Sequence, residues 1–164
     1  MFEAKAITGS KPEFYHELGS QLHALLSGES DPVANAANTS ALIFQMLPDL
    51  NWAGFYFLHT EDELLLGPFQ GKPACVRIAV GCGVCGAAVE KAQSIVVEDV
   101  HAFPGHIACD AASRSELVVP LFRDGQVFGV IDLDSPSPGR FDAADREGIE
   151  ALAATYVSAS SWDD

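Results

Sequence analysis

Basic residues are scarce in this sequence. It has 9 lysines and arginines against 23 aspartates and glutamates, so the formal net charge is −14. A surface of this charge repels phosphate backbones, and we expect no nucleic-acid partner. The simplest consequence of the charge is solubility.

Long apolar runs and targeting segments are also absent. No stretch approaches the ~20 consecutive apolar residues of a membrane span. The N-terminal residues 1–14 lack the basic patch and apolar segment of a signal peptide. We therefore expect a cytoplasmic protein with no membrane partner. Apolar residues make up 48% of the 164 residues, which is enough for a core and predicts one domain over 1–164 with no attached output domain.

The residue pattern predicts helices at both ends of the chain. Apolar residues recur at helical spacing over 12–26. Asp31 is expected to cap a second helix that begins at Pro32 and runs to about residue 47. Asp142 is expected to cap a C-terminal helix over about 142–160.

Between residues 51 and 135 the pattern changes to short β-rich runs. Strands are predicted at 51–60, 61–69, 75–80, 94–100 and on both sides of an Asp124-Gly125 turn, with a helix over 84–93. The loop over 101–114 is long, and such loops are often functional or mobile. Together these elements predict an α+β fold, with a central antiparallel sheet of about six strands and the N- and C-terminal helices packed on it.

The candidate reactive groups are four cysteines: Cys75, Cys82, Cys85 and Cys109. Cysteines of cytosolic proteins seldom form structural disulfides. One hypothesis is a zinc site of Cys82, Cys85, Cys109 and either His101 or His106, although the second half of this ligand pattern is poor. Another is a thioredoxin-like CxxC, which requires a βαβ setting that the predicted antiparallel sheet does not provide.

A third hypothesis concerns the stretch GHIACDAAS, residues 105–113. Its small residues leave Cys109 accessible to a small ligand, and His106 lies three residues before it. A second cysteine brought near by the fold would trap an oxidised intermediate as a disulfide. The alternative is that Cys109 is simply a buried small residue, and composition alone leaves both open.

Three carboxylates are expected to lie close together. Asp132 and Asp134 share one face of a strand, because side chains alternate with a period of two. Glu116 lies on the facing strand of the same hairpin. Mutual repulsion would raise at least one pKa, so that one group could donate a proton while the others hold a cation. A solvated strand face is the alternative, but acids are disfavoured in strands, which favours a functional role.

Trp52 and Tyr56 share one face of the first predicted strand, four residues apart. An aromatic pair near carboxylates can hold a methyl group or a cation. Such pairs also occur simply as part of a core. The spacing alone does not choose between the two.

Several of these motifs together resemble one family. NWAGFYFL, LGPFQGKPACVRI, GVCG, EDVHAFPGHIACDAAS, SELVVPL and GVIDLDS, between about residues 51 and 135, are similar to the free methionine-(R)-sulfoxide reductases, which are built on a GAF domain. The resemblance implies a thiol-based oxidoreductase that reduces free L-methionine-(R)-sulfoxide to L-methionine and so repairs oxidative damage. A non-catalytic GAF module that senses a small molecule is the alternative, and a zinc-binding interaction domain comes third.

The resemblance also implies roles for the cysteines. Cys109 would attack the substrate sulfur and become a sulfenic acid. Cys75 would condense with it, and Cys85 would be the third family cysteine. Thioredoxin, supplied with electrons by NADPH, would recycle the disulfide, with no metal or bound organic cofactor. Cys82 departs from the family pattern, and we interpret it as a bystander.

The rest of the pocket follows from the same resemblance. Glu116, Asp132 and Asp134 would bind the substrate ammonium and protonate the departing oxygen. Trp52 would hold the S-methyl group with Tyr56 close by, and backbone N–H groups of the long loop would bind the carboxylate. A homodimer built through the helices is also expected.

Overall fold

One antiparallel sheet forms the centre of the computed structural model, which describes residues 1–107 and 109–162. Its strands, within those residues, are β1 (Trp52–Thr60), β2 (Glu63–Gly71), β3 (Arg77–Ala79), β4 (Ile95–Val97), β5 (Ser115–Arg123) and β6 (Gln126–Ser135). They lie in the order β3-β2-β1-β6-β5-β4. The predicted α+β fold with an antiparallel sheet of about six strands is confirmed.

The helices include two that begin at the capping residues that the sequence indicates, Asp31 and Asp142. The helical elements are α1 (Lys11–Leu26), α2 (Pro32–Met46), α3 (Gly83–Lys91), α4 (Ala143–Ala159) and the 3-10 turn η1 (Val100–Ala102). The Asp31 side chain accepts a hydrogen bond from the backbone of α2, and Asp142 forms a capping box at the start of α4. These bonds satisfy N–H groups that a helix leaves free in its first turn.

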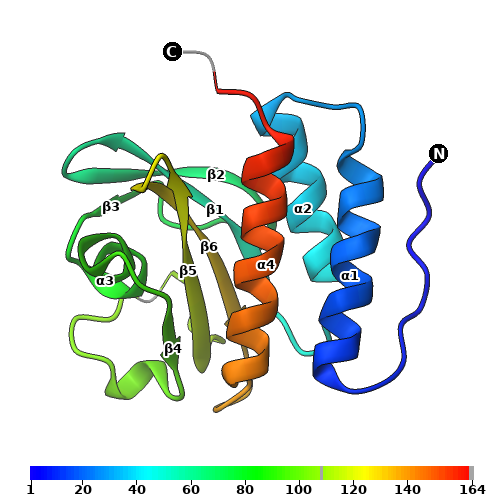
Figure 1. Cartoon of the computed structure of the whole chain (residues 1–164). Coiled ribbons are helices and arrows are strands. Elements are labelled where there is room, and N and C mark those ends of the chain that lie inside the picture. The colour runs from blue at the N-terminus through cyan, green and yellow to red at the C-terminus, as the bar shows by residue number, and fades with distance from the viewer. Residues whose placement is uncertain (108, 163–164) are drawn as a thin grey trace.

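Helices α2 and α4 cover one face of the sheet, and α1 packs on them from the outer side (Figure 1). Ile131 and Leu133 of β6 point into this core, as the alternation predicted. The rings of Phe55 and Tyr156 lie 4.6 Å apart, between β1 and α4. This larger core holds the sheet against the helices and leaves the opposite face for the site.

The opposite face is covered by α3 and the neighbouring loops (Figure 1). Trp52 and Tyr56 lie in this second core, together with Cys85 of α3. Gly86 allows α3 to pack closely, because an added Cβ would lie 2.4 Å from the carbonyl oxygen of Ala79. The close packing positions Cys85 above the sheet.

The turn between β5 and β6 has the geometry that its sequence predicts. Asp124 and Gly125 both have positive φ, 51° and 75°. Two positive φ angles are typical of the type I′ turn, whose twist matches that of a hairpin. The turn sets the register of β5 and β6, and this register places the acidic residues of the two strands.

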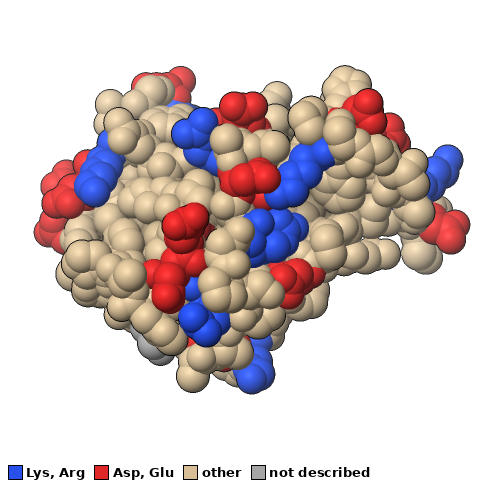
Figure 2. Space-filling view, turned by 90° about the horizontal axis from the view of Figure 1, so that it is seen from below, with Lys and Arg blue, Asp and Glu red and all other residues tan. Residues whose placement is uncertain are grey.

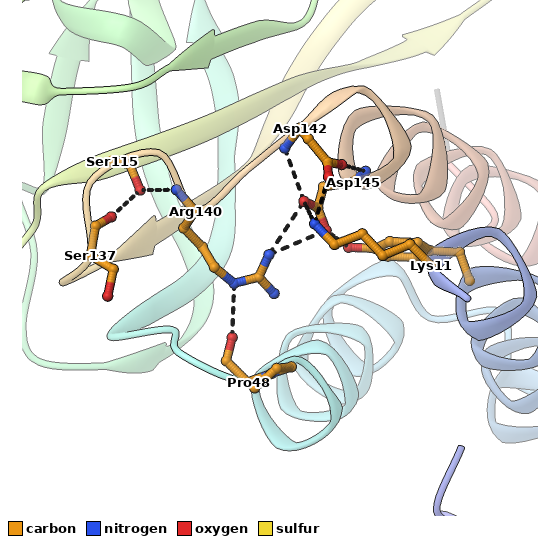
Figure 3. Close-up of polar contacts among 8 residues, drawn as sticks. Lys11, Pro48, Ser115, Ser137, Arg140, Asp142 and Asp145 are labelled. Carbon is orange, nitrogen blue, oxygen red and sulfur yellow. Dashed lines mark hydrogen bonds and ion pairs between the residues drawn. The ribbon is translucent and has the colours of Figure 1, made fainter. Parts of the chain in front are cut away.

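A buried carboxylate joins the two ends of the chain (Figure 3). Asp145 is 1% exposed and accepts hydrogen bonds from the Tyr15 hydroxyl at 2.6 Å and from Lys11 Nζ at 2.6 Å. Arg140 Nη1 lies 3.3 Å from the same carboxylate. Two cations and a hydroxyl therefore compensate the buried charge and fasten α1 to α4.

Arg140 extends this network toward the sheet (Figure 3). Its Nε donates to the carbonyl oxygen of Pro48 at 3.1 Å, and its backbone N–H donates to Ser115 Oγ at 3.3 Å. Ser115 Oγ in turn donates to the carbonyl oxygen of Ser137 at 2.6 Å. Because Ser115 immediately precedes Glu116, the network fixes the start of the strand that carries the acid.

The outer surface shows no patch of one sign on the face drawn in Figure 2. Acidic and basic side chains are interspersed there. The excess of negative charge is therefore not gathered on this face. Among the residues that the structure describes, no helix combines the length and apolar composition needed to cross a membrane.

Candidate active site

A disulfide joins Cys75 and Cys109 across 34 residues of sequence. Cys75 lies just before β3, and Cys109 lies in the loop between η1 and β5. Their Cα atoms are 5.8 Å apart, within the range of ordinary disulfides. Cys109 is exposed, so the alternative that it is a buried small residue is wrong. The structure joins the two cysteines that the family resemblance pairs.

The loop that carries Cys109 is held by a side chain at the start of β1. Asn51 Nδ2 donates to Asp110 Oδ2 at 3.1 Å and to Ser113 Oγ at 3.0 Å. Asp110 Oδ1 accepts from the backbone N–H of Ala112 at 2.9 Å. The Ala112 N–H, and then Asn51, lower the pKa of Asp110. Sequence reasoning missed Asn51; the only local signal was Asp110, whose side chain favours such turns.

Two aromatic residues of β1 position the segment that carries Cys75. The Tyr56 hydroxyl donates to the carbonyl oxygen of Cys75 at 2.8 Å. Trp52 Nε1 donates to the carbonyl oxygen of Lys72 at 3.1 Å. Burial raises the pKa of Tyr56, so its hydroxyl keeps the proton that it donates.

The same two aromatics form one wall of the site. The Trp52 ring stacks on Phe69 at 5.2 Å and on Tyr56 at 5.9 Å between centroids. Gly54 makes room for this stack, because an added Cβ would lie 2.3 Å from Phe69 Cβ and 2.8 Å from Trp52 Cη2. Trp52 and Tyr56, whose role the spacing left open, are therefore part of the core and also line the cavity.

The three predicted carboxylates converge on this wall. Glu116 of β5 lies directly opposite Asp134 of β6, and Trp52 lies opposite Asp134 on the other side. Asp132 lies two residues from Asp134 on the same face. Glu116 and Asp132 are buried, so the alternative of a solvated strand face is wrong for these two residues.

Burial and mutual repulsion keep protons on this cluster. Burial first, and then the charge of Asp134, raise the pKa of Glu116 to about 8. Burial first, and then repulsion from neighbouring carboxylates, raise the pKa values of Asp132 and Asp134 well above the ordinary range. The site therefore holds a carboxyl group that is protonated at neutral pH and lines the same cavity as Cys109, and such a group can act as a general acid.

Cys85 completes the buried cluster from α3. Its Sγ and oxygens of Glu116 and Asp132 all lie within 4.8 Å of one another. Burial, and then the charge of Asp132, raise the pKa of Cys85 well above its usual value, so the thiol is a poor nucleophile. The thiol and the two carboxyl groups could bind a metal ion only after losing their protons, and burial favours the protonated forms. The zinc hypothesis also required Cys109, whose sulfur is bonded to Cys75 here.

The CxxC of Cys82 and Cys85 does not have the setting of a thioredoxin motif. Both are free thiols, Cys82 exposed and Cys85 buried. The helix that they begin connects β3 and β4, which lie at opposite edges of the antiparallel sheet. No βαβ unit results, and the thioredoxin-like interpretation is wrong.

Sequence reasoning also missed the contact between His106 and Glu116. His106 Nε2 lies 3.3 Å from Glu116 Oε2, and burial lowers the pKa of this histidine. The sequence singled out His106 as a possible zinc ligand and as a neighbour of Cys109, and predicted no contact with Glu116. Its contact depends on how the loop folds back over β5, which no periodicity predicts.

These groups surround a small cavity of about 40 Å³. That volume holds a few water molecules. The lining includes Trp52, Tyr56, Cys82, Cys85, His106, Cys109, Asp110, Glu116, Asp132 and Asp134. The structure thus brings all the sequence-predicted binding residues, and three of the four cysteines, around one cavity beside the disulfide.

The fold and the site define a GAF domain with a disulfide beside a cavity lined by buried acids. The GAF domain family matches residues 14–159. The chain is 55% identical to the free methionine-R-sulfoxide reductase of Escherichia coli, over 88% of this chain and 87% of that protein. It is 43% identical to the Saccharomyces cerevisiae enzyme of the same name, over 88% and 84% of the two chains.

Solved structures agree with these relatives. The free methionine-R-sulfoxide reductase from Neisseria meningitidis, solved in complex with its substrate, superposes with a TM-score of 0.93. It is 43% identical, and the match covers 97% of this chain and 95% of that one. The chain belongs to the free methionine-R-sulfoxide reductase family, whose members are oxidoreductases built on a GAF domain.

Proposed function

We propose that this chain reduces free L-methionine-(R)-sulfoxide to L-methionine, with Cys109 as the nucleophile. The observation that carries the proposal is the Cys75–Cys109 disulfide beside a cavity lined by Trp52 and buried acids. The names of the bacterial and yeast relatives, and the substrate complex of the Neisseria meningitidis enzyme, support it.

The cavity suits a free amino-acid sulfoxide. The Trp52 ring offers an apolar face for the S-methyl group. The substrate ammonium needs oxygen acceptors, and Asp132 Oδ1 is buried without a hydrogen-bond partner among the described residues. Backbone N–H groups near Cys109 would receive the substrate carboxylate. A sulfoxide inside a peptide lacks both charges and would be rejected.

The chemical step transfers one oxygen atom. The Cys109 thiolate attacks the substrate sulfur while the sulfoxide oxygen accepts a proton from Glu116, which carries one at neutral pH. The sulfur–oxygen bond breaks as the oxygen passes to Cys109, which becomes a sulfenic acid. The cysteine sulfur loses two electrons and the substrate sulfur gains them, so methionine is released.

Cys75 then resolves the sulfenic acid. Its thiol attacks the Cys109 sulfur, the sulfur–oxygen bond breaks, and water leaves as the disulfide forms. The alternative resolving thiol, Cys85, is buried and holds its proton, which favours Cys75. Because the disulfide form leaves a cavity of only about 40 Å³, substrate would bind after reduction frees the Cys109 loop.

Recycling requires an external dithiol. The exposed position of Cys109 leaves the disulfide open to attack by thioredoxin, which NADPH would keep reduced. The reaction as written needs no metal and no bound organic cofactor. A cytoplasmic, reducing location and a homodimer built through the helices belong to the same proposal.

The test couples thioredoxin and thioredoxin reductase to this protein and follows NADPH oxidation. Free L-methionine-(R)-sulfoxide is expected to be reduced, whereas the S epimer and a peptide-bound sulfoxide are not. Cys109→Ser should lose at least 99% of the rate with an unchanged circular dichroism spectrum, since the nucleophile is removed. If dithiothreitol also fails to support reduction of the R epimer, the proposal is wrong and the cavity is that of a sensor.

A further inference from the structure

The contact between His106 and Glu116 has no part in the chemistry above. Nε2 of the histidine lies 3.3 Å from Oε2 of the glutamate. The two side chains are 14% and 7% exposed, so water has more access to the imidazole than to the acid. His106 also lies three residues before Cys109, on the same loop.

The other titratable groups that face Glu116 cannot return a proton to it at the next turnover. Asp132 and Asp134 reach it from β6, Cys85 from α3 and Tyr56 from β1. Cys85, Tyr56 and Asp132 are acids whose anions would be buried beside it, and the anion of Asp134 would repel the Glu116 carboxylate. His106 differs because its protonated form is a cation that can hand over a proton and become neutral.

We propose that His106 is the proton relay that reloads Glu116 between turnovers. The inference rests on the proposed function and extends it. In each cycle the Cys109 thiol has released its proton to solvent, and Glu116 has given one to the sulfoxide oxygen. The imidazole takes a proton from water and passes the proton on Nε2 to the Glu116 carboxylate. The relay moves one proton inward for each methionine formed and leaves all oxidation states unchanged.

The protonation properties of the pair suit such a relay. Burial lowers the pKa of His106, so the imidazole is neutral between turnovers and free to accept a proton. Burial raises the pKa of Glu116, so the carboxylate takes the proton and holds it until the next substrate arrives. A proton therefore moves downhill from the imidazolium to the acid.

The experiment separates the first turnover from the later ones. Fully reduced protein is mixed with excess free L-methionine-(R)-sulfoxide at pH 7, and methionine is followed through the first turnover and then in the steady state with saturating dithiothreitol. His106→Ala removes the relay, and His106→Gln replaces Nε2 with an amide nitrogen that cannot shuttle protons. His101→Gln is the matched control, because His101 is an exposed histidine near the same loop.

The relay predicts an unchanged first turnover in both His106 variants, because Glu116 begins protonated. Their steady-state kcat should fall about tenfold or more at unchanged KM, within the range that proton-transfer groups contribute. Added imidazole should restore His106→Ala in proportion to its concentration, while His101→Gln behaves as wild type. Thermal unfolding by circular dichroism verifies that each variant is folded.

Two results would overturn the relay. One is a slow first turnover in His106→Ala that His106→Gln repairs, which would show that the histidine only positions Glu116. The other is a wild-type steady state in both variants. If wild-type protein forms no methionine in the first turnover, the proposed function itself has failed.

Discussion

Glu116→Gln is expected to stabilise the folded protein at alkaline pH while removing its proposed acid. The pKa of this carboxyl is 4.5 in an ordinary environment and about 8 in the fold. Below pH 4.5 the Glu116 carboxyl is protonated in both the folded and the unfolded chain, and its burial causes no pH-dependent loss in the free energy of unfolding. Between pH 4.5 and 8 only the folded chain keeps the proton, so the free energy of unfolding falls as the pH rises.

The size of the effect follows from the two pKa values. At about 1.4 kcal/mol per pH unit, the interval from 4.5 to about 8 corresponds to roughly 5 kcal/mol. Above pH 8 the buried carboxylate is ionised and this loss is complete. Glutamine has the same shape and no charge to lose, so the variant escapes the loss. Asp132 and Asp134 are present in both proteins, so their effect on the free energy of unfolding cancels in the difference between the two.

Urea unfolding of the reduced proteins at pH 5, 6, 7, 8 and 9 measures this difference. The free energy of unfolding of Glu116→Gln minus that of wild type should grow by several kcal/mol from pH 5 to 8, with equal m-values. Glu147→Gln, at an exposed position on α4, should show no such growth. A difference that does not change with pH would refute the assignment of a buried, protonated acid.

Four further substitutions test the packing and one of the thiols. Asp145→Ala leaves the buried Tyr15 hydroxyl and the partly buried Arg140 without their carboxylate partner and should cost about 3–5 kcal/mol in urea unfolding, against about 1 kcal/mol for the exposed cap in Asp142→Ala. Gly148→Ala places a Cβ 2.1 Å from the Tyr15 ring, so a loss of about 1–3 kcal/mol and a lower Tm are expected. Cys82→Ser should keep turnover within about twofold of wild type in the thioredoxin-coupled assay; a tenfold loss would show that this thiol relays the disulfide.

The fold was predictable where local chemistry decides it. Asp31 and Asp142 cap the helices that they were expected to cap, and the Asp124-Gly125 turn forms. The predicted strands at 75–80 and 94–100 are shorter in the structure, at Arg77–Ala79 and Ile95–Val97. Both are edge strands with one neighbour, so their length depends on how far that neighbour pairs, which their own residues do not encode.

The site was predictable only in the part that lies on strands. The period of two placed Asp132 and Asp134 on one face, and the hairpin turn brought Glu116 opposite. The contacts of Asn51 and His106 come from an irregular loop, where neither face nor partner follows from spacing. The pairing of Cys75 with Cys109 came from the family resemblance, since four cysteines alone allow several pairs.

Solvent access assigns different chemistry to Cys109 and Cys85. Cys109 is exposed beside the cavity, where an external dithiol can reach the disulfide. Cys85 lies in the same core that raises the pKa of Glu116, and that burial keeps its thiol protonated.

A protein that needs a protonated carboxyl and a reactive thiol at one substrate must therefore place the acid on the buried strands and the thiol on a loop at the edge. The antiparallel GAF sheet meets both needs, because β5 and β6 are covered by α3 while the loop that enters β5 remains at the surface. Moving the nucleophile from position 109 to position 85 would bury it with the acids. We therefore expect that Cys85 cannot replace Cys109 as the nucleophile.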